Sequence, residues 1–321
     1  MLRAAHAHRD LEIDVTSRID VFRAIEDAEL ILAFEPMPNL SGAYYRNAGV
    51  LINANHPLAR QRYTAAHEFG HHLFKHGTSV DPMTDPLARW GGQTHWPDHE
   101  KQAEAFAAWF LMPKKLVNAS LDQLGLKRPG SAQDVYSLAL RLGTSYEATA
   151  RHLPNLKLGS QTQRDGWLKA KPRELKLALA EGAPPKDMRN DVWRIDERDN
   201  GAVVAVRIGD RLVIELRDVP SSGYQWLSGI SRSDVRVVAD SFKDALPQLD
   251  LLEEAADEVD GADLVHIFVV EIDHDAEANR EPVKFRRVRP WTADVVDTFE
   301  LDLDIQRPRI GISEEMLRIA A

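Results

Sequence analysis

The stretch Arg62–Phe74, RYTAAHEFGHHLF, decides how the rest of the chain is interpreted. It contains the pattern His-Glu-x-x-His at His67, Glu68 and His71, in which two histidines bind zinc and the glutamate acts as a base. Residues four apart project from one face of an α-helix, so both imidazoles can converge on one ion. Glu68 lies about 100° round the helix from His67, where it can hold a water molecule beside the metal.

A charged amphipathic helix could match this short pattern by chance. The rest of the stretch favours the metal-binding interpretation, because Gly77 is a natural helix stop and an apolar stripe lies beside the histidines, made of Ala66, Gly70, Leu73 and Phe74. Histidine is also clustered, since six of the 12 histidines fall between positions 67 and 99: His67, His71, His72, His76, His95 and His99.

Composition limits the remaining possibilities. The 321 residues suggest two or three domains, and cysteine is absent, so any metal site must use histidines and carboxylates. No apolar run approaches the roughly 20 residues of a membrane span, and the N-terminus lacks the apolar core of a signal peptide. We therefore expect a cytoplasmic protein without a membrane partner. The net charge of −10 argues against a general nucleic-acid-binding surface.

The third metal ligand is expected from a helix that runs from Asp98 to Met112. Its apolar stripe carries Glu100 and Glu104 beside it, and carboxylates there are costly unless they are paired or bind a metal. A catalytic zinc site has three protein ligands and an open position. We predict Glu100 as the ligand and Glu104 as the acceptor that orients a ligand imidazole. Exchanged roles, a contribution from His95 or His99, and a half-exposed acidic face are the alternatives.

Other segments surround the predicted site. Residues 20–26 indicate a helix, and residues 30–34, 42–45 and 49–53 indicate strands, of which the last is either a peptide-binding edge or a buried strand. Residues 77–97 predict a flap over the site or a disordered loop. Candidate donors to the oxyanion of a transition state are Tyr44, Tyr45, Arg62 and His95.

Three features together resemble the ImmA/IrrE metallopeptidases over roughly residues 10–165: the block Arg62–His71, the glutamate-bearing helix, and its ending FAAWFLMP at 106–113. Members of that family are zinc endopeptidases of bacteria and mobile elements, and they typically cleave a helix-turn-helix repressor to start a DNA-damage or excision programme. The resemblance implies His67, His71 and Glu100 as ligands and Glu68 as the base. The family usually has asparagine where this chain has Glu104, which keeps an acceptor but changes the charge.

Residues 131–156 predict a helix-turn-helix outline. Ser131 and Asp134 form a loose capping box, Gly143 makes a turn, and Ser145 starts a second helix. Arg151 is the only firm positive charge on that second helix, so we expect packing or substrate docking there rather than contact with DNA.

The last third predicts a β-sandwich, from strands at 203–206, 210–216, 264–272 and 299–305 separated by turns. Its loops at 219–226, 260–263 and 289–291 resemble the chagasin family of cysteine-protease inhibitors, which have an immunoglobulin-like sandwich. The resemblance implies that these loops form a wedge that enters the cleft of a papain-like protease. The residues of this wedge are Ser222, Gly223, Tyr224, Trp226, Gly261, Arg289, Pro290 and Trp291. The middle loop departs from the family, because an acidic insert at 252–260 precedes a shortened glycine stretch.

We therefore expect an α+β protein with these parts: a zincin-like metallopeptidase at 1–125, a helix-turn-helix-like extension at 126–165, a linker at 166–190, a chagasin-like β-sandwich at 191–310 and a tail at 311–321. The expected function is zinc-dependent cleavage of a helix-turn-helix repressor or antitoxin-like regulator in a bacterial stress, DNA-damage or mobile-element response. The sandwich would recognise a protein or regulate the peptidase by an intramolecular contact. The alternatives are a non-enzymatic regulator with a structural zinc site and a fusion of a protease with a working inhibitor.

Overall fold

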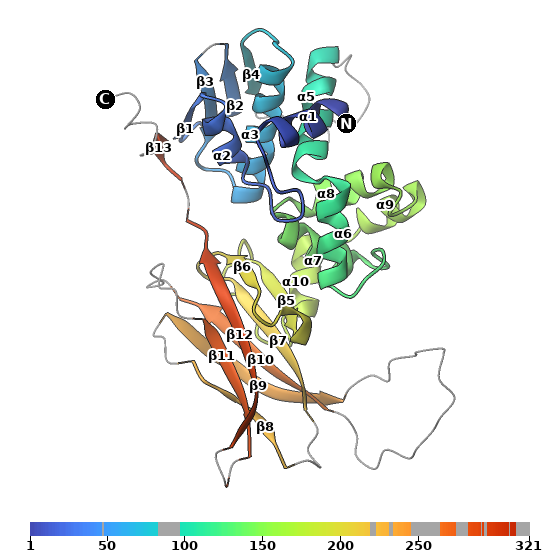
Figure 1. The fold of residues 1–321 in the computed structure, drawn as a ribbon, viewed down its shortest axis with the longest axis vertical. Coiled ribbons are helices and arrows are strands. Elements are labelled where there is room, and N and C mark those ends of the chain that lie inside the picture. Colours follow the sequence, from blue (N-terminus) through green and yellow to red (C-terminus); the bar gives the residue numbers. More distant parts are fainter. Residues whose placement is uncertain are drawn as a thin grey trace. The chain divides into compact units, whose positions relative to one another are not determined.

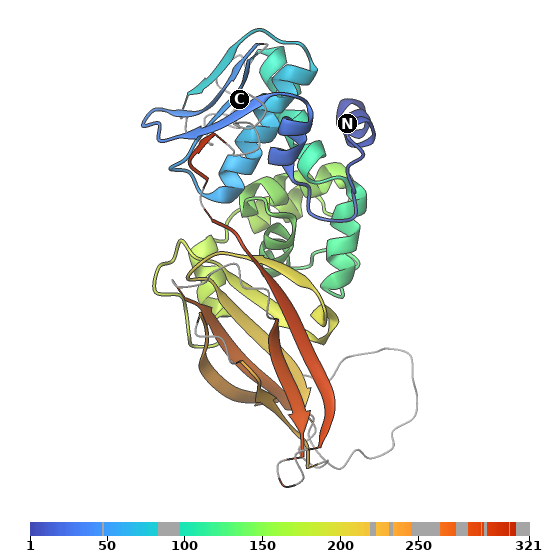
Figure 2. The same ribbon diagram turned by 60° about the vertical axis from the view of Figure 1, so that its left-hand side comes forward.

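The chain forms two compact units in a computed structural model (Figures 1 and 2), the first consisting of Met1–Lys169 with Pro308–Ala321 and the second of Ala170–Arg307. The structure describes residues 1–46, 48–82, 97–218, 223–230, 234–244, 264–273, 282–289, 291, 294–307 and 309–312. The predicted flap falls mostly on 83–96, outside this range, as do His95, Ser222, Gly261 and Pro290. None of the described helices combines the length and apolar character of a membrane span.

A mixed sheet forms one layer of the first unit. Among the described residues its strand order is β13-β1-β3-β2-β4, and β1 and β3 run parallel while the other pairs are antiparallel. The strands are β1 (Ile31–Glu35), β2 (Leu40–Tyr45), β3 (Gly49–Asn53), β4 (Ser79–Pro82) and β13 (Gly311–Ile312). The predicted strand 49–53 is therefore an inner strand, and β4 lies at the edge.

Helices cover this sheet and extend from it. The first three are α1 (Leu2–Asp10), α2 (Val21–Asp27) and α3 (Leu58–Leu73), and α5 (Asp98–Leu111) follows. Helix α3 packs against β2, β3 and α5 (Figure 1). Its buried face includes Ala65, Ala66 and Phe69, and the Phe69 ring meets the rings of Phe106 and Phe110 edge-on. These apolar contacts hold the predicted metal helix between the sheet and α5.

The other helices in the described part of this unit are α6 (Lys114–Gln123), α7 (Ala132–Leu142), α8 (Tyr146–His152), the 3₁₀ helix η1 (Leu153–Leu156) and α9 (Gln161–Trp167). The predicted capping box of Ser131 and Asp134 is confirmed, as is the turn at Gly143, whose φ of 66° favours glycine. Arg151 forms an ion pair with Glu147 on the same helix at 2.7 Å. This pairing fits a packing helix rather than one that contacts phosphates.

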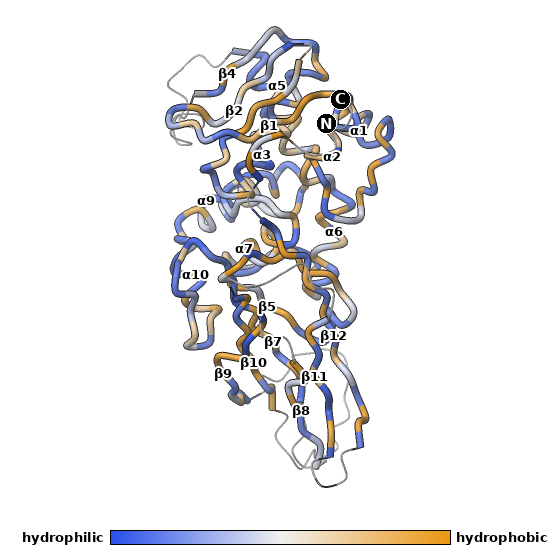
Figure 3. The backbone as a smooth tube through the Cα atoms, turned by 90° about the vertical axis from the view of Figure 1, so that its left-hand side faces the viewer, coloured by the Kyte–Doolittle hydropathy of each residue, from blue (hydrophilic) through white to orange (hydrophobic). Residues whose placement is uncertain are grey.

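The second unit is a β-sandwich. Among the described residues its sheets have the orders β5-β7-β10-β9 and β6-β12-β11-β8, and they meet where the rings of Phe268 and Phe285 lie 4.6 Å apart. Strand β11 alternates between buried and exposed residues, as a strand covered on one face should (Figure 3). The strands are β5 (Val192–Asp196), β6 (Val203–Val206), β7 (Arg211–Asp218), β8 (Gln225–Ser228), β9 (Val235–Asp244), β10 (Leu264–Ile272), β11 (Val283–Val288) and β12 (Val295–Ile305), with the 3₁₀ helix η2 (Glu197–Asp199).

Two segments differ from the expected division. Within the expected linker, α10 (Pro172–Leu179) packs against β5, and the Lys176 ammonium donates to the Asn190 carbonyl at 2.7 Å and pairs with Asp191 at 2.9 Å. The expected tail starts with β13, which pairs with β1. The partners of Lys176 lie 14 and 15 positions further along the chain, and the partner of β13 lies near the other end of the chain, so neither contact is apparent from composition.

Candidate metal centre

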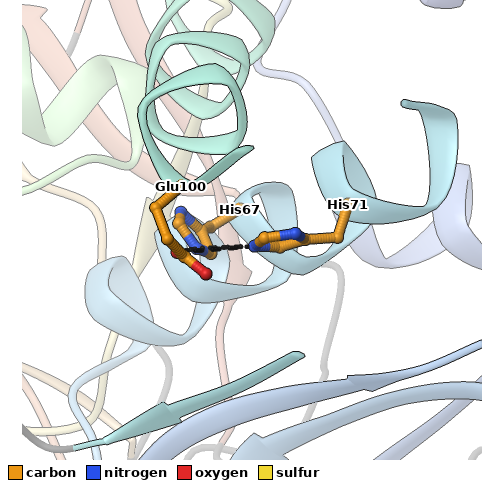
Figure 4. Close-up of side chains that lie close together, drawn as sticks. All are labelled: His67, His71 and Glu100. Carbon is orange, nitrogen blue, oxygen red and sulfur yellow. Dashed lines mark hydrogen bonds and ion pairs between the residues drawn. The ribbon is translucent and has the colours of Figure 1, made fainter. Parts of the chain in front are cut away.

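Helix α3 presents two histidines from one face, as the spacing predicted. His67 and His71 are both buried, and their Nε2 atoms lie 3.2 Å apart. Glu100 approaches from α5, with its Oε2 atom 3.1 Å from the Nε2 atom of His67 and 3.5 Å from that of His71 (Figure 4). Three donor atoms from two helices therefore meet at one point.

The spacing of these atoms suits a tetrahedral metal ion. With bonds of about 2.0–2.1 Å, neighbouring ligand atoms on a tetrahedron are about 3.3–3.4 Å apart. The observed separations of 3.1, 3.2 and 3.5 Å lie around that value. Together, His67, His71 and Glu100 could hold a metal ion.

A close approach of two helices brings Glu100 into range. A Cβ atom on Gly70 of α3 would lie 3.1 Å from both the Ala103 Cα atom and the Phe106 ring, so this position has no room for a larger residue. Ala103 lies one turn after Glu100, on the same side of α5. The Gly70–Ala103 contact therefore fixes the distance between the two histidines and the glutamate.

The substitution Gly70→Leu is expected to force α3 and α5 apart. Overpacking of this kind costs about 1–3 kcal/mol of stability, and the separation of Glu100 from the histidines should weaken zinc binding. Competition with a chromogenic chelator and urea unfolding measure the two effects. Gly166→Leu is the matched control, because Gly166 also lies in a helix but has open space around it. Wild-type zinc affinity in Gly70→Leu would contradict the role of this contact.

The second carboxylate oxygen of Glu100 contacts residues other than the two predicted histidine ligands. Oε1 accepts a hydrogen bond from the Ser79 hydroxyl at 3.2 Å and lies 3.4 Å from the Nε2 atom of His99. Strand β4 thus reaches the metal centre through Ser79. These contacts turn one carboxylate oxygen toward the imidazoles and keep the other away from them.

Glu104 lies where an orienting acceptor was predicted. Its Oε2 atom is 3.4 Å from the Nδ1 atom of His67, and its Oε1 atom accepts a hydrogen bond from the Tyr63 hydroxyl at 2.7 Å. Glu100 has an oxygen beside the Nε2 atoms of both histidines, whereas Glu104 faces the outer nitrogen of His67. Tyr63 was missed by the sequence analysis, although its position four residues before His67 on the same helix face was a usable signal.

Buried charges around the imidazoles change their protonation. Burial alone would lower the pKa of His67, but the hydrogen bonds that its ring donates to Glu100 and Glu104 and the charge of Glu68 raise it to about 10. Burial alone would raise the pKa of Glu100, but hydrogen bonds with His67 and His71 hold it below its ordinary value. The carboxylates thus favour a positive charge between them, which a proton supplies in the metal-free chain.

Glu68 is fully buried on α3 under strand β2. A Cβ atom on Gly42 of β2 would lie 3.5 Å from the Glu68 Cγ atom and 2.5 Å from a methyl group of Thr64. The glycine therefore lets the strand lie close over the helix. Glu68 directly follows His67 on α3, so the predicted base lies next to the predicted ligands.

Two predicted donors to the oxyanion are directed elsewhere. The Arg62 guanidinium donates to the carbonyls of Gly143 at 2.9 Å and Ile19 at 2.6 Å, so it links α3 to other parts of the unit. Tyr45 is 46% exposed on the opposite face of β2 from Tyr44. Tyr44 is buried, with its hydroxyl 3.3 Å from the Nδ1 atom of His72. Arginine and tyrosine near a zinc motif suggested catalysis, but side-chain direction depends on tertiary contacts.

Five of the predicted recognition residues lie in the described part of the second unit. The Arg289 guanidinium lies 4.4 Å from the centre of the Tyr224 ring, and a Cβ atom on Gly223 would lie 2.8 Å from the indole of Trp291. Trp291 is 71% exposed. Trp226 is instead buried and donates to the Arg217 carbonyl at 2.9 Å, so it belongs to the core.

Comparison with known proteins gives one family and several similar structures. The family described as IrrE N-terminal-like domain (Peptidase_M78) matches residues 26–153. No curated protein matches the chain. Among solved structures, the cysteine protease inhibitor EhICP2 from Entamoeba histolytica is 16% identical, with a TM-score of 0.28, and covers 36% of this chain and 95% of its own. Amebosin, in a solution structure, is 19% identical, with a TM-score of 0.23, and covers 35% of this chain and 96% of its own.

The family match spans the strands β1 to β4 and the helices that carry His67, Glu68, His71 and Glu100. The predicted resemblance to the ImmA/IrrE metallopeptidases is therefore confirmed in this segment. Residues 26–153 form an IrrE N-terminal-like domain of the Peptidase_M78 family.

Proposed function

We propose that the chain is a zinc-dependent endopeptidase. The observation that carries this proposal is the convergence of His67, His71 and Glu100 from two helices, with donor atoms 3.1–3.5 Å apart, beside the buried Glu68. Two imidazoles and one carboxylate are a typical ligand set for catalytic zinc, which leaves one position open for the reaction. A structural zinc site would have no use for a base at Glu68.

The metal ion, when bound, acts as a Lewis acid on the scissile carbonyl. Glu68 accepts a proton from the attacking water molecule while the oxygen of that water bonds to the carbonyl carbon. The same carboxyl group then gives that proton to the nitrogen as the carbon–nitrogen bond breaks. One water molecule is consumed, and the products are a new carboxyl terminus and a new amino terminus. Burial of Glu68 keeps it positioned and strengthens its interaction with a reacting proton.

The position of strand β4 is an argument for a polypeptide substrate. This strand lies at the edge of the described sheet, and Ser79 at its start contacts the Glu100 carboxylate. An extended peptide can add to such an edge through main-chain hydrogen bonds. A peptide bound there would pass beside the metal centre.

The proposed substrate is a helix-turn-helix repressor or antitoxin-like regulator in a bacterial stress, DNA-damage or mobile-element response, by analogy with the resembling family. Its cleavage would take place in the cytoplasm, and this chain would contact the protein rather than DNA. The test incubates the zinc-loaded chain with the soluble proteome of its source cells and identifies new amino termini by mass spectrometry. Cuts in such a regulator that a zinc chelator abolishes support the proposal, and the absence of metal-dependent cuts contradicts it.

The second unit is proposed to recognise a protein or to regulate the peptidase. The exposed Trp291 and the Arg289–Tyr224 pair form a surface suited to protein contacts, because aromatic and arginine side chains dominate such contacts. Trp291→Ala in the full chain separates the two roles. Substrate docking predicts slower cleavage, autoinhibition predicts faster cleavage, and an unchanged rate contradicts both. Titration against a papain-like protease tests the remaining alternative, a working inhibitor.

A further inference from the structure

The two predicted histidine ligands have different partners on their outer nitrogen atoms. The Nδ1 atom of His67 faces the Glu104 carboxylate. The Nδ1 atom of His71 lies 3.0 Å from the Nδ1 atom of His76, whose Nε2 atom lies 3.1 Å from the Oε1 atom of Gln102. We propose that His76 and Gln102 are positioning residues, which fix the orientation of the His71 ring and its tautomer through a relay of two hydrogen bonds. This proposal rests on the metal centre of the proposed function.

Only one arrangement of protons satisfies this relay when His71 binds a metal. His71 would use the lone pair of Nε2 for the metal, so its hydrogen must be on Nδ1. His76 then accepts that hydrogen bond at Nδ1 and carries its own hydrogen on Nε2. The amide oxygen of Gln102 is an acceptor and closes the relay. With the other tautomer of His76, two N–H groups would face each other across 3.0 Å.

The end of helix α3 places His76 beside His71. Lys75 adopts φ of 59°, a left-handed conformation that is costly for a residue other than glycine or asparagine. The backbone N–H of Lys75 donates a hydrogen bond to the His72 carbonyl, and the backbone N–H of His76 donates one to the His71 carbonyl, both at 2.9 Å. This pair of hydrogen bonds is a Schellman motif. The helix thus stops here and not at the predicted Gly77. The turn folds the chain back, so that the His76 ring stacks on Phe74 and meets the edge of His71.

Electrostatics explain why the relay behind His71 ends in an amide rather than in a carboxylate. Glu68, Glu100 and Glu104 already bring three carboxylates to a site that would hold one divalent cation. A carboxylate behind His71 would add a fourth negative charge, whereas His76 and Gln102 orient the ring while remaining neutral. Ligand histidines are generally oriented by such outer partners, and removal of a partner typically weakens metal binding 10–100-fold.

The experiment measures zinc affinity of the full chain by chelator competition and records the visible spectrum of the Co²⁺-loaded chain. His76→Phe keeps the ring that stacks on Phe74 but removes the acceptor, so we expect zinc binding about 10–100-fold weaker and a shifted Co²⁺ spectrum. Gln102→Leu changes an exposed position and should also weaken zinc binding. Gln102→Glu adds the fourth negative charge but keeps an acceptor for His76, so its zinc affinity should lie above that of Gln102→Leu.

His72→Phe is the matched control. His72 is the next residue on α3, and its ring stacks on Phe69 without joining the relay, so wild-type affinity is expected. Wild-type affinity and an unchanged Co²⁺ spectrum in His76→Phe and Gln102→Leu would overturn the relay. An equal loss in His72→Phe and His76→Phe would also reject it, because packing alone would then explain both. If the wild-type chain binds no zinc, the metal centre of the proposed function is contradicted, and this result differs from a failure of the relay.

Discussion

Glu68→Gln is expected to slow peptide-bond hydrolysis by about two to four orders of magnitude, the usual contribution of a general base. Glutamine has the same shape and keeps the buried position, but it cannot accept the proton of the attacking water. Zinc affinity should stay close to wild type, because Glu68 is not among the three residues whose donor atoms converge. The rate of appearance of new amino termini in the substrate measures the effect, and chelator competition measures the affinity.

The matched control is Glu147→Gln, which removes an exposed carboxylate that pairs with Arg151 on α8, outside the metal centre. Its cleavage rate should equal that of the wild type. Cleavage by Glu68→Gln at the wild-type rate would sink the assignment of the base. A wild-type chain that binds zinc but cuts no protein would favour the non-enzymatic regulator, in which the metal is structural.

Glu100→Gln is expected to weaken zinc binding by roughly two to three orders of magnitude. A four-ligand zinc site supplies about 10–16 kcal/mol, which is about 2.5–4 kcal/mol for each ligand. Glutamine keeps the size of the side chain but loses the negative charge that the metal and both imidazoles face. Chelator competition measures the loss, and circular dichroism checks that the helices are retained.

Glu104→Gln is the comparison that decides between the two carboxylates. Glu104 faces the outer nitrogen of His67, so its replacement should cost less, about 10–100-fold. If Glu104 were the ligand and Glu100 the orienting residue, the order of the two losses would be reversed. Equal affinities of both variants and the wild type would show that zinc binds elsewhere.

Local signals in the sequence were sufficient for the elements that carry the site. The spacing of His67 and His71 places them on one helix face whatever surrounds the helix, and the capping box at Ser131 depends only on neighbouring residues. Glu100 was predicted for a similar reason, because a carboxylate beside an apolar stripe needs a partner, and together with His67 and His71 it could hold a metal ion. The donors to the oxyanion could not be chosen in this way. Arg62 and Tyr45 face other groups, and only the packing of the whole unit decides that.

The sequence by itself thus placed the two histidines on one helix face and indicated the family, because helix geometry is a property of a few consecutive residues, and the role of Glu68 as the base stays a prediction. Tertiary structure decided how these residues work together. The distance from Glu100 to His67 depends on the contact between Gly70 and Ala103, which lie 33 positions apart. The proposed relay behind His71 depends on Gln102, which lies 26 positions after His76, and the sheet edge is completed by a strand from the other end of the chain. Contacts between residues far apart in the sequence are set by packing of the folded chain, and no local pattern encodes them.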